Sequence, residues 1–114
     1  MSSSPKERQL WDACTSSNLD LVKSLLSSWV TFNVNWIGPE RNDTSLHRAC
    51  RFGHLSIVEI LLQQPLINVN VGNVGMASPF NIACQEGRTA VVKLLLDDQR
   101  IDVNRSTIQG GTPF

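Results

Sequence analysis

The residues with the clearest chemical potential stand close together in the middle of the chain: His47, Cys50 and His54. Imidazole and thiolate are ligands that zinc prefers, and on an unbroken helix the i, i+3, i+7 spacing would place all three on one face. Gly53 predicts that the helix ends before His54, because glycine readily adopts the left-handed conformation that closes a helix. We therefore expect no metal site here and no cofactor.

The thiols of Cys14, Cys50 and Cys84 are the remaining candidates for a nucleophile. A reactive thiol needs a lowered pKa and a nearby base, and cysteines in apolar surroundings have neither. We therefore expect all three to be core residues and free thiols, and we expect no enzyme. An odd number of cysteines is also most simply accommodated in a reducing compartment.

Other functions lack the residues that they need. Nucleic-acid binding requires a basic surface, whereas ten Lys and Arg balance ten Asp and Glu in this chain. Gly72 and Gly75 are not followed by the Lys-Ser or Lys-Thr pair of a phosphate-binding loop. Residues 1–9 lack the apolar segment of a secretory signal, and no apolar run reaches the length of about 18 residues that spans a membrane. We expect an intracellular, cytoplasmic protein without nucleic-acid or membrane partners.

A short pattern recurs three times along the chain. An Ala-Cys pair is followed at a constant distance by a block of mostly aliphatic residues and then by a Val-Asn pair. The Ala-Cys pairs are Ala13-Cys14, Ala49-Cys50 and Ala83-Cys84, and the blocks are residues 21–26, 57–62 and 91–96. The pairs are 36 and 34 residues apart, a period that is typical of stacked helical repeats.

The apolar residues within a unit have helical spacing. In the second unit Leu46, Ala49 and Cys50 stand at i, i+3 and i+4, which places them on one face of a helix that packs into the core. The block at residues 57–62 repeats this pattern, so each unit is predicted to hold two short helices. The residues expected to cap helix N-termini are Thr44, Ser78 and Thr112, and those expected to end the first helices in the left-handed conformation are Asn18, Gly53 and Gly87.

These units resemble a known family. Residues 44–49, Thr-Ser-Leu-His-Arg-Ala, resemble the ankyrin repeat, whose motif opens Thr-Pro-Leu-His-x-Ala. The third unit keeps the proline as Pro79 but has no histidine, and the first keeps only the apolar spacing. The resemblance implies an all-α solenoid of stacked helix-turn-helix units with protruding β-turn loops. The expected divisions are a disordered tail at residues 1–7, repeats at about residues 8–43, 44–77 and 78–111, and the start of a fourth repeat at residues 112–114.

The same resemblance implies a function. Ankyrin repeats grip protein partners with their loop tips and the concave surface of their first helices, so we expect a non-catalytic protein-protein interaction module. Carried over to this chain, the loop tips are residues 36–43, 71–77 and 105–111. The residues expected to bind the partner are Trp36, Arg48, Arg51, Phe52, Ile82, Gln85 and Glu86. The alternative function is a structural spacer within a longer ankyrin-repeat protein, and a minor alternative is a thiol or metal-site enzyme.

Within this surface, Arg48, Arg51 and Phe52 are predicted to form the centre, with Trp36 and Ile82 at the margins. The three central residues lie side by side on a helix and point away from its core face, so they would be free to meet a partner with an acidic, apolar-spotted surface. The alternative for Phe52 is packing against its own helix end, with solvated arginines beside it. The alternative for Trp36 is shielding of the base of its loop.

The C-terminal side of the third unit is expected to be apolar, because a fourth repeat begins at Thr112 and stops within the same motif. A stack without a polar end repeat exposes this side to water. We therefore expect self-association through the last repeat, or a mobile last helix.

Overall fold

The computed structural model describes residues 5–27 and 33–104 of the chain. These residues form six α-helices and no strand, which agrees with the all-α fold expected from the sequence. The helices are α1 (Lys6–Ser16), α2 (Leu19–Leu26), α3 (Ser45–Arg51), α4 (Leu55–Leu62), α5 (Pro79–Gln85) and α6 (Thr89–Leu96). None of the helices within these residues combines the length and the apolarity needed to cross a membrane.

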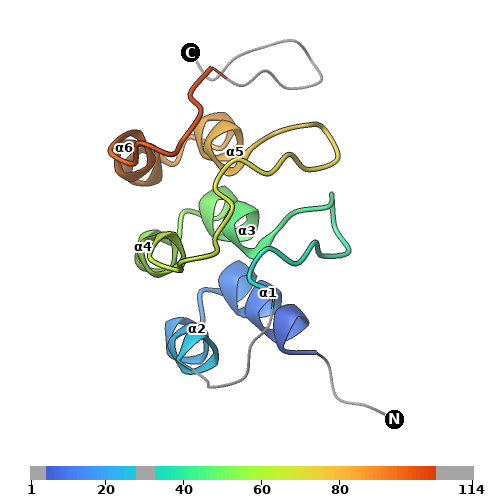
Figure 1. Cartoon of the computed structure of the whole chain (residues 1–114). Coiled ribbons are helices and arrows are strands. Elements are labelled where there is room, and N and C mark those ends of the chain that lie inside the picture. Colours follow the sequence, from blue (N-terminus) through green and yellow to red (C-terminus); the bar gives the residue numbers. More distant parts are fainter. Residues whose placement is uncertain (1–4, 28–32, 105–114) are drawn as a thin grey trace.

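The helices stack in two parallel rows. The inner helices α1, α3 and α5 follow one another along the stack, and α2, α4 and α6 form the outer row beside them (Figure 1). Two loops extend from the inner row on the side away from the outer helices, at the right of Figure 1. We call residues 36–43 the first finger and residues 71–77 the second finger. A third loop predicted at residues 105–111 lies outside the described residues.

The expected caps define where helices α3 and α5 begin. The Thr44 hydroxyl accepts a hydrogen bond from the backbone N–H of His47, and the Ser78 hydroxyl accepts one from that of Asn81. Pro79 occupies the first turn of α5, where its missing N–H has no cost. Both caps are therefore confirmed, whereas Thr112 and the start of a fourth repeat lie outside the described residues.

Two details at the N-terminal end differ from the prediction. Helix α1 begins at Lys6, so it includes two residues that the sequence assigned to a tail ending at residue 7. The left-handed residue after α1 is Ser17, with φ 63°, and not Asn18. Asn18 instead caps α2 by accepting the backbone N–H of Leu21. Ser17 is the counterpart of Gly53, whose φ is 70°, so register within the repeat outweighs the intrinsic preference of asparagine.

The core lies between the two rows of helices, where the periodicity predicted it. Leu46, Ala49 and Cys50 are fully buried, and they pack with Ile57 and Leu61 from the outer helix of the same unit. Equivalent residues of the other units join them in one continuous cluster. Because each unit buries its apolar face only against its neighbours, the position of every inner helix depends on the stack as a whole.

The asparagines of the Val-Asn pairs join successive units. The Asn35 side chain donates to the Leu66 carbonyl at 2.8 Å and accepts from the Asn68 N–H at 2.7 Å. Asn70 makes the same two hydrogen bonds one unit later: its side chain donates to the Arg100 carbonyl at 2.7 Å and accepts from the Asp102 N–H at 2.9 Å. An amide side chain can donate and accept at once, which explains why asparagine recurs here. These bonds fix the distance from one unit to the next and so the spacing of the fingers.

Candidate functional site

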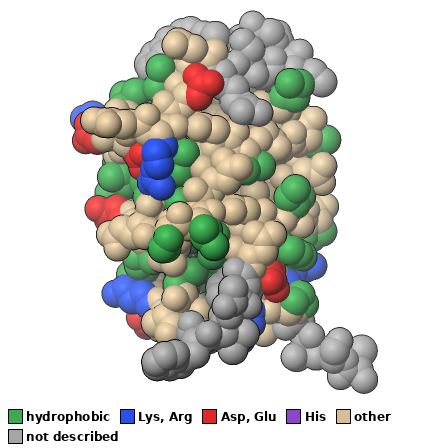
Figure 2. Space-filling model, viewed as in Figure 1, with side chains coloured by type: hydrophobic (Ala, Val, Ile, Leu, Met, Phe, Trp, Pro, Cys, Tyr) green, Lys and Arg blue, Asp and Glu red, His purple; other side chains and the backbone are tan. Residues whose placement is uncertain are grey.

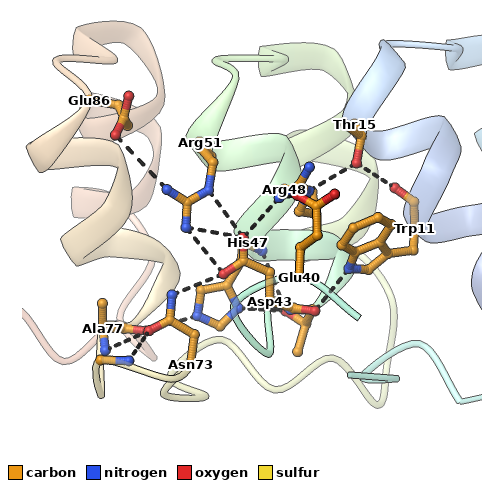
Figure 3. A network of polar contacts seen from close by, with 12 residues as sticks. Trp11, Thr15, Glu40, Asp43, His47, Arg48, Arg51, Asn73, Ala77 and Glu86 are labelled. Carbon is orange, nitrogen blue, oxygen red and sulfur yellow. Dashed lines mark hydrogen bonds and ion pairs between the residues drawn. The ribbon is translucent and has the colours of Figure 1, made fainter. Parts of the chain in front are cut away.

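A buried carboxylate organises the inner face of the stack. Asp43, the last residue of the first finger, is completely inaccessible to solvent. Its Oδ2 accepts a hydrogen bond from Arg51 Nε at 3.1 Å, and its Oδ1 accepts from Arg51 Nη2 at 3.2 Å and from Asn73 Nδ2 at 2.9 Å. Arg48 Nη1 lies 3.4 Å from Oδ2 (Figure 3). One carboxylate thus joins α3 to both fingers.

The charged form of Asp43 is favoured by these neighbours. Burial acts to raise the pKa of Asp43, but the hydrogen bonds from Arg51 and Asn73, with the positive charges nearby, outweigh burial and hold the pKa below its ordinary value. Bidentate contact between a guanidinium and a carboxylate also fixes the orientation of both groups. The Arg51 side chain is therefore held rigidly on the inner face.

Arg48 is held by aromatic rings as well as by carboxylates. Its guanidinium carbon lies 4.4 Å from the centre of the Trp11 ring and 5.1 Å from that of Phe52. Its Nε donates to the Thr15 hydroxyl at 3.0 Å, and Nη1 lies 3.6 Å from a carboxylate oxygen of Glu40. Cation-π contacts of this kind stabilise a guanidinium that has lost most of its water. Arg48 therefore connects the first unit to the second and is not free.

His47 connects the second unit to the third. Its Nδ1 accepts the backbone N–H of Thr44 at 3.1 Å, so Nε2 carries the proton and donates to the Ala77 carbonyl at 2.8 Å. Burial lowers the pKa of His47 and outweighs the hydrogen bond to Ala77 and the charge of Asp43, which act in the opposite direction. The neutral imidazole thus serves as a fixed link between repeats.

The expected exposure of the two central arginines is wrong. Arg48 and Arg51 are only 5% and 8% exposed, although the helical spacing correctly placed them on the face opposite the core. The first finger folds against that face and brings Asp43 between the two guanidiniums (Figure 3). Their positive charges are largely matched within the protein, so they do not form a broad basic surface for a partner.

The remaining predicted residues occupy different environments. Phe52 is partly exposed beyond the end of α3, where its ring stacks on His54 with centroids 6.2 Å apart, so it both packs and faces solvent. Trp36 is half-buried, while its neighbour Ile37 is exposed. Ile82 was expected at an exposed margin but is almost fully buried. Gln85 and Glu86 are exposed at the end of α5.

The structure brings four of the seven predicted residues to one hollow of about 190 Å³ between the second finger and α5. The predicted residues that line it are Arg51, Ile82, Gln85 and Glu86. Arg41 from the first finger and Val74 from the second complete its rim. Arg48 and Phe52 do not line this hollow and lie toward α1, where Arg48 contacts Trp11 and Thr15.

The comparisons with known proteins agree with this arrangement. The family model of ankyrin repeats, with three copies, matches residues 10–107. The chain belongs to the ankyrin repeat family. No curated protein sequence gives a significant match. Ankyrin repeats are generally protein-protein interaction modules and are typically non-enzymatic.

The candidate chemical groups of this ankyrin-repeat chain are used for packing. The three cysteines are free. Burial raises the pKa of Cys14 to about 12 and raises the pKa of Cys50 and Cys84 as well, which makes their thiols poor nucleophiles. Helix α3 ends before His54, whose Nε2 lies 3.0 Å from the Thr15 carbonyl oxygen. The described residues contain no group of three potential ligands that could hold a metal ion.

Sequence reasoning missed the residues that position the site. Asp43 and Asn73 come from the fingers, and Trp11 donates its indole N–H to the Asp43 carbonyl at 2.9 Å from α1. The sequence held one weak sign of this network. The residue directly before the helix cap is Asp43 in the second unit, whereas the equivalent residue of the third unit is Ala77. A carboxylate at that point, followed five and eight residues later by arginines, indicates a local ion-pair cluster.

Proposed function

We propose that this chain binds a protein partner through a surface made of the two fingers and the exposed ends of α3 and α5. The observation that carries the proposal is the exposure of large apolar side chains on both fingers. Ile37 is 53% exposed, Val74 is 64% exposed and Met76 is 53% exposed. In Figure 2, hydrophobic side chains are visible along the finger side at the right of the view, and others lie in the centre and at the left. Large apolar residues that remain in water on a rigid scaffold are characteristic of interaction sites.

The fingers present these side chains in a fixed arrangement. In the first finger the Gly38 N–H donates to the Asp43 carbonyl at 2.9 Å. In the second, Asn73 Oδ1 accepts from the N–H groups of Gly75 and Ala77, each at 3.1 Å. The Val74 N–H donates to the Arg41 carbonyl at 2.8 Å, which joins one finger to the other. A surface that is ordered before binding loses less conformational entropy when a partner binds.

A pair of triple variants tests the proposal. In the finger variant, Ile37→Ser, Val74→Ser and Met76→Ser remove the apolar side chains from the fingers. In the control variant, Leu21→Ser, Leu66→Ser and Leu96→Ser remove three exposed leucines from other parts of the stack. Proteins captured by the unmodified chain are purified, and their affinities for all three forms are measured by isothermal titration calorimetry.

We expect a direct partner to lose at least about tenfold in affinity for the finger variant and to bind the control variant normally. Circular dichroism at matched concentrations checks that both variants keep their helices. Equal losses in the two variants would contradict the proposal, and so would normal binding by the finger variant. The latter result would favour a spacer role for this segment.

A further inference from the structure

The hollow between the second finger and α5 contains a buried cation with unused donors. Arg51 directs Nε and Nη2 to Asp43, and the structure gives Nη1 no hydrogen bond to any described residue. The one ion pair of Nη1 is with Glu86 Oε2 at 3.9 Å, which is too long for a hydrogen bond. The Arg51 side chain is only 10% exposed, and it lines the hollow.

Unused donors on a buried guanidinium favour an acceptor. Leaving a buried polar group without a hydrogen bond is costly, and the cost is greater when the group is charged. The Asp43 carboxylate holds the plane of the Arg51 guanidinium, so the Nη1 edge is ready to receive a second carboxylate without rearrangement. The hollow, at about 190 Å³, has room for the end of one side chain.

A second cation lies on the rim of the same hollow. Arg41 lines it from the first finger, and its backbone carbonyl is bonded to Val74 on the opposite rim. Arg41 is exposed and has no ion pair with any described residue. Two arginines thus line the hollow together with one glutamate, Glu86, whose side chain is 42% exposed and able to turn toward solvent.

We propose that the hollow receives the side-chain carboxylate of an aspartate or glutamate of the protein partner. The carboxylate hydrogen-bonds to Arg51 Nη1 and is attracted by Arg41, and Glu86 moves away. Glu86 thus competes with the ligand in the free protein and does not contact the partner favourably. This inference rests on the proposed function and specifies one chemical feature of the partner.

A basic side chain fits the hollow less well. It carries only donors, so it could not accept a hydrogen bond from Arg51 Nη1, and among the residues that line the hollow it would find only Glu86 as an acidic partner. Asp43 offsets much of the charge of Arg51, but its oxygens already accept from Arg51 and Asn73 and are shielded from solvent, so it offers no acceptor to a basic ligand. The unused donors of Arg51 and the charge of Arg41, which is unpaired among the described residues, therefore favour an acidic ligand.

Three capped tripeptides test the inference: acetyl-Leu-Glu-Leu-amide, acetyl-Leu-Gln-Leu-amide and acetyl-Leu-Lys-Leu-amide. Each is titrated into ¹⁵N-labelled full chain, and nuclear magnetic resonance follows the backbone amides of Val74 and Gln85 and the Nε–H of Arg51. We expect the glutamate peptide to shift these signals in a saturable manner. The glutamine and lysine peptides should bind at least about tenfold more weakly, because hydrogen bonds to charged groups are stronger.

Variants decide whether Glu86 is a competitor. Glu86→Gln should tighten the glutamate peptide by at least about threefold, because it removes the internal carboxylate. Glu40→Gln is the matched control: it removes the same charge from an exposed glutamate that pairs with Arg48 and does not line the hollow, so it should have little effect. Arg41→Gln should weaken binding by about threefold or more.

Several results would overturn the inference. They are the absence of a saturable shift, equal binding of the glutamine peptide, preference for the lysine peptide, and a Glu86→Gln change that weakens binding or only matches Glu40→Gln. None of them depends on the fate of the finger variant. A partner that is lost from the finger variant but has no acidic residue in contact with Arg51 would leave the proposed function intact and refute this inference alone.

Discussion

Replacement of Asp43 by asparagine is expected to destabilise the whole stack. The change preserves the shape of the side chain but removes the negative charge between Arg48 and Arg51, which are both nearly buried. Breaking a buried ion pair by removing one partner costs about 3 to 5 kcal/mol, since the other charge is left buried without compensation. Arg48 keeps Glu40 at 3.6 Å and the Trp11 ring, and Arg51 keeps Glu86 at 3.9 Å, so we place the loss near the lower limit, at about 3 kcal/mol.

Urea unfolding at pH 7, followed by circular dichroism, measures this loss. With an m-value of about 2 kcal/mol per molar urea, a loss of about 3 kcal/mol moves the midpoint down by about 1.5 M. Asp12→Asn is the control, because it removes the same charge from an exposed i, i+4 pair with Arg8. The control should lose less than about 0.5 kcal/mol.

The effect of Asp43→Asn also depends on pH. The pKa of Asp43 is lower in the folded protein than in the unfolded chain, so ionised Asp43 stabilises the fold fully above the unfolded pKa of about 4. This stabilisation declines as the pH falls through the lower folded pKa. The difference in unfolding free energy between the unmodified chain and Asp43→Asn should therefore shrink below about pH 4.

Two results would refute this reasoning about Asp43. One is a loss at pH 7 that is no larger than that of the Asp12→Asn control. The other is a difference that grows as the solution is acidified. Either result would mean that the charge of Asp43 does not hold the inner face together.

Three further predictions follow from packing. Gly38→Ala should lower the midpoint of thermal unfolding by several degrees, because a Cβ at this position would overlap the Trp11 indole. An unchanged midpoint in a calorimetric scan would contradict this close packing. In the native protein a thiol reagent should modify half-buried Cys84 before fully buried Cys50, as measured by mass spectrometry of digested samples. Equal rates of modification at the two cysteines would show that the core opens freely. Asn70→Ala should cost about 1 to 2 kcal/mol in urea unfolding, since it removes two hydrogen bonds between units, and no loss would mean that water replaces them.

The sequence by itself determined the features that depend on residues close together in the chain. Helical spacing identified Leu46, Ala49 and Cys50 as core residues, and the structure buries all three. Thr44 and Ser78 were recognised as caps because a hydroxyl just before a helix binds the free N–H groups of its first turn. The period of the repeat indicated stacked helices, and the motif at residues 44–49 indicated the family.

The surroundings of the inner face were decided only by the tertiary structure. Helical spacing placed Arg48 and Arg51 opposite the core, but it could not show that the first finger covers that face. The path of that finger depends on bonds to distant parts of the chain: Trp11 lies 32 residues before Asp43, and Asn73 lies 30 residues after it. These groups meet only when the units stack. Arg48 and Arg51, which the helical spacing placed on an open face, then become buried beside Asp43, and the Nη1 edge of Arg51 is left without a hydrogen bond to a described residue. The physical reason is that a charge removed from water must find its partners within the fold.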